Sequence, residues 1–227
     1  MGSDGFFVTG TDTECGKTEI TLGLMQCLQT LGHSVVGMKP VASGAEQTAE
    51  GLRNQDALRL QQQSSIDVDY ELVNPYAFAP PIAPHLAAVQ AGVEIDPSRI
   101  HACFRDLSRR ADYVLVEGVG GWRVPLSRRL AVSDLAVTMG LPVILVVGLR
   151  LGCINHGLLS VESIEMAGVE LAGWVANLMD AEMQEVQANL ISLQQRIGAP
   201  LLGFIPHLDS PSSESIVAAG LRVPMTG

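Results

Sequence analysis

The amino-acid sequence predicts one three-layer α/β/α domain over residues 1–227, with a mostly parallel sheet. Two observations support this fold class. Short apolar segments alternate with segments of helical period, which is typical of successive βαβ units. In addition, 47% of the residues are hydrophobic, which is enough to bury both faces of such a sheet. No repeat or low-complexity segment divides the chain.

Six apolar segments are expected to form the strands: residues 6–9, 35–38, 113–116, 143–147, 174–176 and 201–205. Helices are expected between them. The first begins after Lys17 and ends at Gly32, because apolar residues repeat at helical spacing between these positions. Three more begin at Asp96, at Ser133 and near Asn155, and a fifth covers residues 183–197.

The alternation of strand and helix stops between Glu46 and Pro84. Residues 74–85 are rich in proline and aromatic side chains. We interpret this part as an excursion over one face of the sheet, within the same domain.

Charge and cysteine content exclude several functional classes. The formal net charge of −10 argues against non-specific nucleic-acid binding, which depends on clustered cations. The four cysteines show no C-x-x-C pairing and the five histidines no H-x-x-x-H spacing, so a zinc site is not expected. The N-terminus lacks the basic start and apolar core of a signal peptide. No apolar stretch approaches the roughly 20 residues that span a bilayer. We therefore expect a cytoplasmic protein with reduced thiols.

A glycine-rich loop follows the first predicted strand and gives the clearest indication of function. Residues 10–18 read Gly-Thr-Asp-Thr-Glu-Cys-Gly-Lys-Thr. The backbone amides of such a loop cradle phosphates, Lys17 reaches the terminal phosphates and Thr18 ligates Mg²⁺. The pattern G-x-x-x-x-G-K-[ST] is missed by one place, because Thr11 stands where the first glycine is expected and Gly10 precedes it. The strand before the loop and the helix after it still predict Mg²⁺-ATP binding and a P-loop NTPase-like fold.

Acidic side chains lie where a metal site is expected. Glu117 ends an apolar strand and is followed by Gly118 and Gly120. Open parallel sheets bind ligands beyond the carboxyl ends of their strands, and Mg²⁺ prefers one or two carboxylates together with phosphate oxygens. Glu117 is therefore a candidate metal ligand. Asp56 is a second candidate, although an aspartate that caps a helix is also compatible with the sequence.

Two further side chains follow strands in the same way. The chain contains only two lysines, and Lys39, like Lys17, falls just after a predicted strand. There it can face the γ-phosphate from the side opposite Lys17, the alternative being an ordinary exposed lysine. Asn177 ends another strand, where its amide can pair with adenine or can simply terminate the strand.

Taken together, these segments resemble the dethiobiotin synthetase family, ATP-dependent carboxylases that close the ureido ring in biotin synthesis. The resemblance is carried by residues 7–14, 16–18, 39–44, 51–54, 56–58, 74–76, 84–85, 114–122, 142–147, 151–156 and 172–177. It extends from residue 7 to residue 177 and is far more specific than a phosphate loop alone.

The resemblance implies 7,8-diaminononanoate, CO₂ and Mg²⁺-ATP as substrates. A substrate amine takes up CO₂ as a carbamate, a carbamate oxygen attacks the γ-phosphorus, and the second amine closes the cyclic urea. By this resemblance Lys17 and Lys39 are catalytic and flank the carbamate and the γ-phosphate. Thr18, Asp56 and Glu117 are the implied Mg²⁺ ligands.

The resemblance also implies the binding residues and a homodimer. The implied nucleotide-binding residues are Thr13, Glu14, Cys15, Gly16, Lys17, Thr18, Glu19, Asp56, Glu117, Gly118, Val119, Gly120, Asn177, Leu178, Pro206, His207 and Leu208. The substrate is implied to contact Ser43, and its carboxylate to contact Gly152, Cys153 and Asn155 of the other subunit.

The sequence departs from the family pattern in two places. Cys15 occupies a loop position where an apolar residue such as valine is expected. Beyond Pro206 the match decays, so the acidic residue that the family carries there corresponds to Glu214 or is absent.

Two alternative functional classes each require a feature that this sequence does not show. Partitioning-type ATPases, which act by nucleotide-gated dimerisation, carry an extra lysine five residues before the loop lysine, where this chain has Asp12. Amidotransferase-type ligases related to cobyrinate diamide synthases usually carry an added glutaminase domain, for which 227 residues leave no room.

Overall fold

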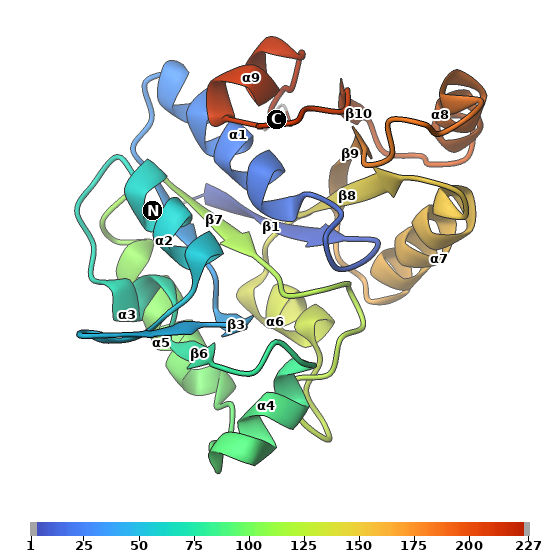
Figure 1. Ribbon diagram of the computed structural model, residues 1–227. Coiled ribbons are helices and arrows are strands. Elements are labelled where there is room, and N and C mark those ends of the chain that lie inside the picture. The colour runs from blue at the N-terminus through green and yellow to red at the C-terminus, as the bar shows by residue number, and fades with distance from the viewer. Residues whose placement is uncertain (1–3, 225–227) are drawn as a thin grey trace.

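The computed structural model describes residues 4–224 and contains a six-stranded sheet with helices on both faces (Figure 1). The strand order is β10-β9-β8-β1-β7-β2, and every pairing in it is parallel. The strands are β1 (Asp4–Gly10), β2 (Val35–Met38), β7 (Tyr113–Glu117), β8 (Val143–Leu149), β9 (Leu171–Leu178) and β10 (Leu201–Ile205). The prediction of a mostly parallel three-layer fold is confirmed.

Successive side chains of β1 belong to different faces of the sheet, as the period of a strand requires. Phe6 and Val8 pack in the core under α1 (Lys17–Thr30) and α9 (Ser213–Ala218). Phe7 packs in the larger core under the helices of the other face. These helices are α5 (Pro97–Leu107), α6 (Val132–Met139), α7 (Cys153–Met166) and α8 (Val186–Gln194). With both faces covered, the carboxyl edge of the sheet remains open for a site.

The segment that the sequence analysis interpreted as an excursion contains short elements of its own. They are β3 (Val41–Ser43), β4 (Glu46–Thr48), β5 (Gly51–Arg53), α2 (Gln55–Gln63), α3 (Tyr70–Val73), β6 (Tyr76–Phe78) and α4 (Pro84–Ala91). β3 pairs with β6 in parallel and β4 with β5 in an antiparallel hairpin. Strands of three residues are too short to show a period of two, which is why the sequence did not reveal them.

Two helices near the C-terminal end of the chain, α8 and α9, differ from the sequence predictions. The helix expected over residues 183–197 is shorter, because α8 runs from Val186 to Gln194. The sequence analysis did not predict α9, whose six residues span less than two turns. None of the helices in residues 4–224 is long and apolar enough to cross a membrane.

Candidate functional site

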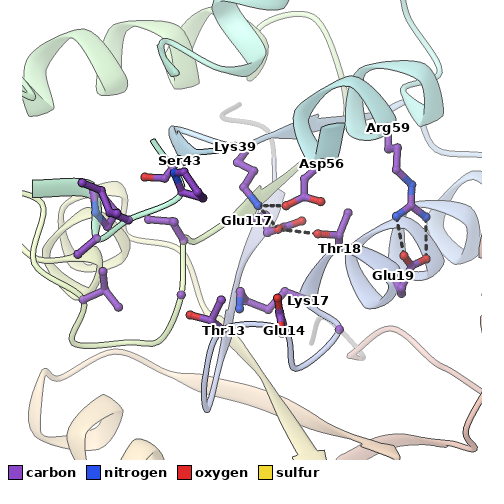
Figure 2. A pocket seen from close by; sticks show the side chains of 18 of the residues that line it. Thr13, Glu14, Lys17, Thr18, Glu19, Lys39, Ser43, Asp56, Arg59 and Glu117 are labelled. Atoms are coloured by element: carbon purple, nitrogen blue, oxygen red, sulfur yellow. Dashed lines mark hydrogen bonds and ion pairs between the residues drawn. The ribbon is translucent and has the colours of Figure 1, made fainter. Parts of the chain in front are cut away.

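A cavity of about 790 Å³ opens at the carboxyl ends of β1, β7 and β2. The phosphate loop forms one side, α2 and the end of β7 form the back, and the segment before α4 closes the other side (Figure 2). The lining residues are Thr13, Glu14, Gly16, Lys17, Thr18, Glu19, Lys39, Ser43, Asp56, Arg59, Pro81, Ile82, Ala83, Pro84, Glu117, Val119, Gly120, Val124 and Met179. The structure therefore brings both lysines, the glycine loop and the acidic end of β7 to one place.

The conformation of the loop explains why its glycine stands at position 10. A Cβ atom at Gly10 would lie 2.3 Å from Sγ of Cys15 and 3.1 Å from Cγ of Lys17. Gly16, at the start of α1, has φ 87°, and Glu14 also adopts a left-handed conformation with φ 56°. The chain thus folds back on β1 so closely that only a glycine fits at position 10.

The two side chains nearest the loop backbone are already engaged. Lys17 is buried and donates from Nζ to the carbonyl oxygen of Asp12 at 2.8 Å. Asn177, at the end of β9, donates from Nδ2 to the carbonyl oxygen of Cys15 at 3.0 Å. Asn177 therefore supports the phosphate loop, a role that the sequence analysis missed. Its contact with adenine stays a prediction.

Behind the loop, one buried ammonium joins two carboxylates. Nζ of Lys39 donates to Oδ2 of Asp56 at 2.5 Å and to Oε1 of Glu117 at 2.6 Å. The hydroxyl of Thr18 donates to the same Oε1 at 2.9 Å. Lys39 is 5% exposed and Glu117 only 1%. Four side chains from β7, α1, α2 and the end of β2 therefore form one hydrogen-bonded cluster (Figure 2).

The cluster keeps Lys39 and Asp56 charged. Burial would lower the pKa of Lys39, but the negative charges of Glu117 and Asp56 outweigh this effect and raise the pKa above its ordinary 10.5. Burial would raise the pKa of Asp56, but the charge and hydrogen bond of Lys39 and the charge of Arg59 hold it below 3.8. An ammonium and a carboxylate therefore face each other at neutral pH.

The oxygen atoms of this cluster fit a magnesium ion. Oε2 of Glu117 is buried and has no hydrogen-bond partner among the described residues. Asp56 and Thr18 line the same cavity. Two carboxylates and a hydroxyl are the hard oxygen ligands that Mg²⁺ prefers beside phosphate. The capping alternative for Asp56 is not supported, because Asn54 is the N-cap of α2 and accepts from the amide of Ala57.

Several other predicted residues also lie on the cavity wall. Ser43, Val119 and Gly120 line it. Oγ of Ser43 is buried without a partner among the described residues, so it is available to a ligand. Gly118 lies behind the wall, where a Cβ atom would stand 3.1 Å from the ring of Phe7.

The remaining predicted residues lie outside the cavity. Gly152, Cys153 and Asn155 are at the start of α7. Leu178 ends β9, and residues 206–208 follow β10, on the same edge of the sheet as the phosphate loop. Cys15 is 2% exposed and packs under the loop.

One charged residue and the apolar wall of the cavity were not predicted from the sequence. Arg59 of α2 donates from Nη1 and Nη2 to the two carboxylate oxygens of Glu19, at 2.5 and 2.7 Å. Glu19 was predicted only as a nucleotide-binding residue. The missed apolar wall residues are Pro81, Ile82, Ala83, Pro84, Val124 and Met179. Glu19 and Arg59 are 40 positions apart in the chain, so no local sequence pattern predicts their contact.

Comparison with known proteins supplies close relatives. The sequence profile of a family described as "AAA domain" matches residues 4–215. A protein of Pseudomonas aeruginosa named ATP-dependent dethiobiotin synthetase is 55% identical over 214 residues, which are 94% of each chain. A protein of the same name from Aromatoleum aromaticum is 52% identical, over 96% of this chain and 97% of the relative. A third, from Salmonella typhi, is 50% identical over 91% of each chain.

Solved structures that resemble the fold are more distant in sequence. The MinC:MinD cell division complex of Aquifex aeolicus gives a TM-score of 0.60 at 17% identity, over 99% of both chains. A ParA-family ATPase from Chlorobium tepidum gives 0.57 at 14% identity, over 96% of this chain and 89% of the other. At this identity the likeness concerns the fold alone. It confirms the P-loop NTPase-like architecture and does not favour the partitioning alternative.

Proposed function

The chain belongs to the family of ATP-dependent dethiobiotin synthetases, and we propose that it converts 7,8-diaminononanoate, CO₂ and Mg²⁺-ATP into dethiobiotin, ADP and phosphate. The observation that carries the proposal is the convergence of Lys17, Lys39 and the pair Asp56–Glu117 on one cavity beside the phosphate loop. The proposed reaction builds anionic oxygen atoms at this position, and the chain supplies two ammonium groups there.

The proposed chemistry has three steps. One substrate amine attacks CO₂ and loses a proton to the solvent, which gives a carbamate. A carbamate oxygen then attacks the γ-phosphorus, the bond to the β–γ bridging oxygen breaks, and ADP leaves. The second amine attacks the carbonyl carbon of the resulting carbamic–phosphoric anhydride and loses a proton to the solvent, and phosphate leaves as the ring closes.

In this proposal the protein's part is to orient groups and to stabilise negative charge. Lys39 is the cation nearest the carbamate, and Lys17, whose ammonium rests on the carbonyl of Asp12, turns to the terminal phosphates. The unpartnered hydroxyl of Ser43 hydrogen-bonds the substrate. Mg²⁺, held by Thr18, Asp56 and Glu117, would neutralise the phosphate oxygens.

The apolar part of the cavity suits the hydrocarbon chain of the proposed substrate. Ile82, Pro84, Val119 and Val124 line the wall. Burying methylene groups there contributes about 0.8 kcal/mol each. In this proposal the same wall limits the access of water to the anhydride, which water would hydrolyse.

We propose a cytoplasmic homodimer. In it, the start of α7 of one subunit binds the carboxylate of the substrate that lies in the cavity of the other subunit. Gly152, Cys153 and Asn155 stand at a helix N-terminus, which attracts anions. They lie outside the cavity of their own chain. The neighbouring Leu151 is 98% exposed, which suits a surface that a second subunit covers. The adenine contacts are assigned to Asn177, Leu178 and residues 206–208.

Mass spectrometry tests the proposal directly. The protein is supplied with 7,8-diaminononanoate, ATP, Mg²⁺ and ¹³C-bicarbonate, and the expected product is dethiobiotin carrying one ¹³C atom. Lys39→Ala should yield almost none. Arg110→Ala, which breaks an exposed ion pair with Asp106, should yield as much as the unmodified protein. Absence of labelled dethiobiotin from a protein that binds Mg²⁺-ATP would rule the proposed activity out.

A further inference from the structure

An ion pair at the edge of the cavity joins the two helices that carry candidate metal ligands. Arg59 of α2 and Glu19 of α1 form two parallel hydrogen bonds, at 2.5 and 2.7 Å (Figure 2). Glu19 follows Thr18 directly in α1. Arg59 lies three residues after Asp56 in α2, so both side chains are on the same face of that helix. Each partner is therefore fixed to a residue of the cluster by less than one helical turn.

The geometry of the pair favours a positioning role over a direct contact with phosphate. Both Nη atoms of Arg59 are already bonded to Glu19, which neutralises the guanidinium and orients it toward α1. The side chains are 37% and 20% exposed, so the planar fork is partly shielded from water. A bidentate pair fixes both distance and angle between the elements that carry it.

The helices are joined a second time, far from the cavity. Nε2 of Gln63, at the end of α2, donates to Oε1 of Gln26 and of Gln29 in the second half of α1. None of these three glutamines lines the cavity. The pair Arg59–Glu19 is thus the polar bridge between α1 and α2 that lies nearer the site.

We propose that the Glu19–Arg59 pair is a positioning clamp that holds Asp56 and Thr18 at the separation required for one magnesium ion. The proposal rests on the metal site of the proposed function. It predicts that loss of either partner weakens Mg²⁺ binding, and that loss of both weakens it no further, because the pair acts as a unit.

Charge effects alone predict a different result. Loss of the negative charge of Glu19 would weaken the attraction for Mg²⁺, whereas loss of the positive charge of Arg59 would strengthen it. A clamp gives the same sign for both single variants. The sign of the Arg59 variant therefore separates the two explanations.

The experiment measures binding, without turnover. Calorimetry gives the affinity for ADP with Mg²⁺ and with EDTA in the unmodified protein, Glu19→Gln, Arg59→Gln and the double variant. The ratio of the two affinities reports the metal site. We expect each single variant to lower this ratio about threefold, which lies within the range for a partly exposed ion pair, and the double variant to lower it about as much. Arg110→Gln serves as the matched control and should leave the ratio unchanged. It breaks the exposed ion pair with Asp106 of α5, and neither residue lines the cavity.

The outcomes separate failure of the clamp from failure of the metal site. If Mg²⁺ does not tighten ADP binding to the unmodified protein, the proposed metal site is wrong. If it does, and Arg59→Gln keeps or raises the ratio, the clamp is refuted. Additive losses in the double variant refute it too. If Arg59→Gln lowers the ADP affinity in EDTA as much as it does in Mg²⁺, a contact between Arg59 and phosphate is indicated instead.

Two controls complete the experiment. A melting temperature close to that of the unmodified protein shows that each variant is folded. Arg59→Lys, which keeps the charge but not the planar fork of the guanidinium, should recover only part of the ratio.

Discussion

Replacement of Lys39 tests the buried cluster in two ways, because this residue is placed both in the fold and in the reaction. Its ammonium holds Asp56 at 2.5 Å and Glu117 at 2.6 Å. Removing it leaves Glu117, which is 1% exposed, with the hydroxyl of Thr18 as the only donor recorded in the described structure. An uncompensated buried charge of this kind costs about 3 kcal/mol.

The expected magnitudes follow from this geometry. For a domain of this size, about 3 kcal/mol lowers the melting temperature by roughly 6–12 °C. Asp56 is 39% exposed, so loss of its ion pair with Lys39 adds only a small part of this destabilisation. Turnover should fall about a hundredfold or more, as when one preorganised charge contact is removed. Mg²⁺ should restore part of the stability, because a divalent cation can neutralise both carboxylates.

Two variants separate the charge from the packing of the side chain. Lys39→Met keeps most of the apolar stem and Lys39→Ala removes it, so both should lose turnover while Lys39→Met melts at the higher temperature. Dethiobiotin formation is followed by mass spectrometry and unfolding by calorimetry, each with and without Mg²⁺. Near-normal turnover in either variant would remove Lys39 from the mechanism. An unchanged melting temperature in EDTA would contradict the buried ion pairs.

Four further predictions concern other parts of the site. Glu117→Gln should weaken the Mg²⁺ dependence of ADP binding, and an unaltered Mg²⁺ titration would refute its assignment as a ligand. Gly10→Ala should lower ADP affinity about tenfold, a strain of the size that overpacking causes, because its Cβ would lie 2.3 Å from Sγ of Cys15; adding Cys15→Ala should recover part of the loss. Since the pKa of Lys39 is raised by its carboxylate partners in spite of burial, the pair's contribution to stability is present below pH 10.5 and is lost as the pH rises through the higher folded-state pKa. The metal-free unfolding free energy should therefore fall less steeply above pH 10.5 in Lys39→Met than in the unmodified protein. Leu151→Asp should convert the proposed dimer into a monomer in sedimentation measurements and reduce turnover while ADP binding persists.

The sequence predicted the parts of the fold whose signals are local. The parallel strands are continuous apolar runs, and the phosphate loop stands between a strand and a helix, so both were recognisable along the chain. The short strands β3 to β6 were not, because three residues carry no measurable period. The reason that position 10 holds a glycine comes only from the structure, because a Cβ atom there would lie 2.3 Å from Sγ of Cys15.

The residues of the candidate site were also predictable only where the signal is local in the sequence. Lys17, Thr18 and Glu117 follow strands of one parallel sheet, whose carboxyl ends share an edge. Asp56 was ambiguous until Asn54 proved to be the cap of α2. The partner of Arg59 lies 40 positions away in the chain, and no pattern of spacing predicts such a contact. The support that Asn177 gives to the loop likewise depends on how β9 is placed beside β8.

The central claim is that both lysines and both carboxylates serve one Mg²⁺-triphosphate at the rim of the sheet. A crystal structure with Mg²⁺ and a non-hydrolysable ATP analogue tests it most directly. We predict the γ-phosphate between the ammonium groups of Lys17 and Lys39, and the metal bound by Thr18, Asp56 and Glu117. A triphosphate bound elsewhere, or a Lys39 that stays paired with both carboxylates and out of reach of the γ-phosphate, would contradict the account.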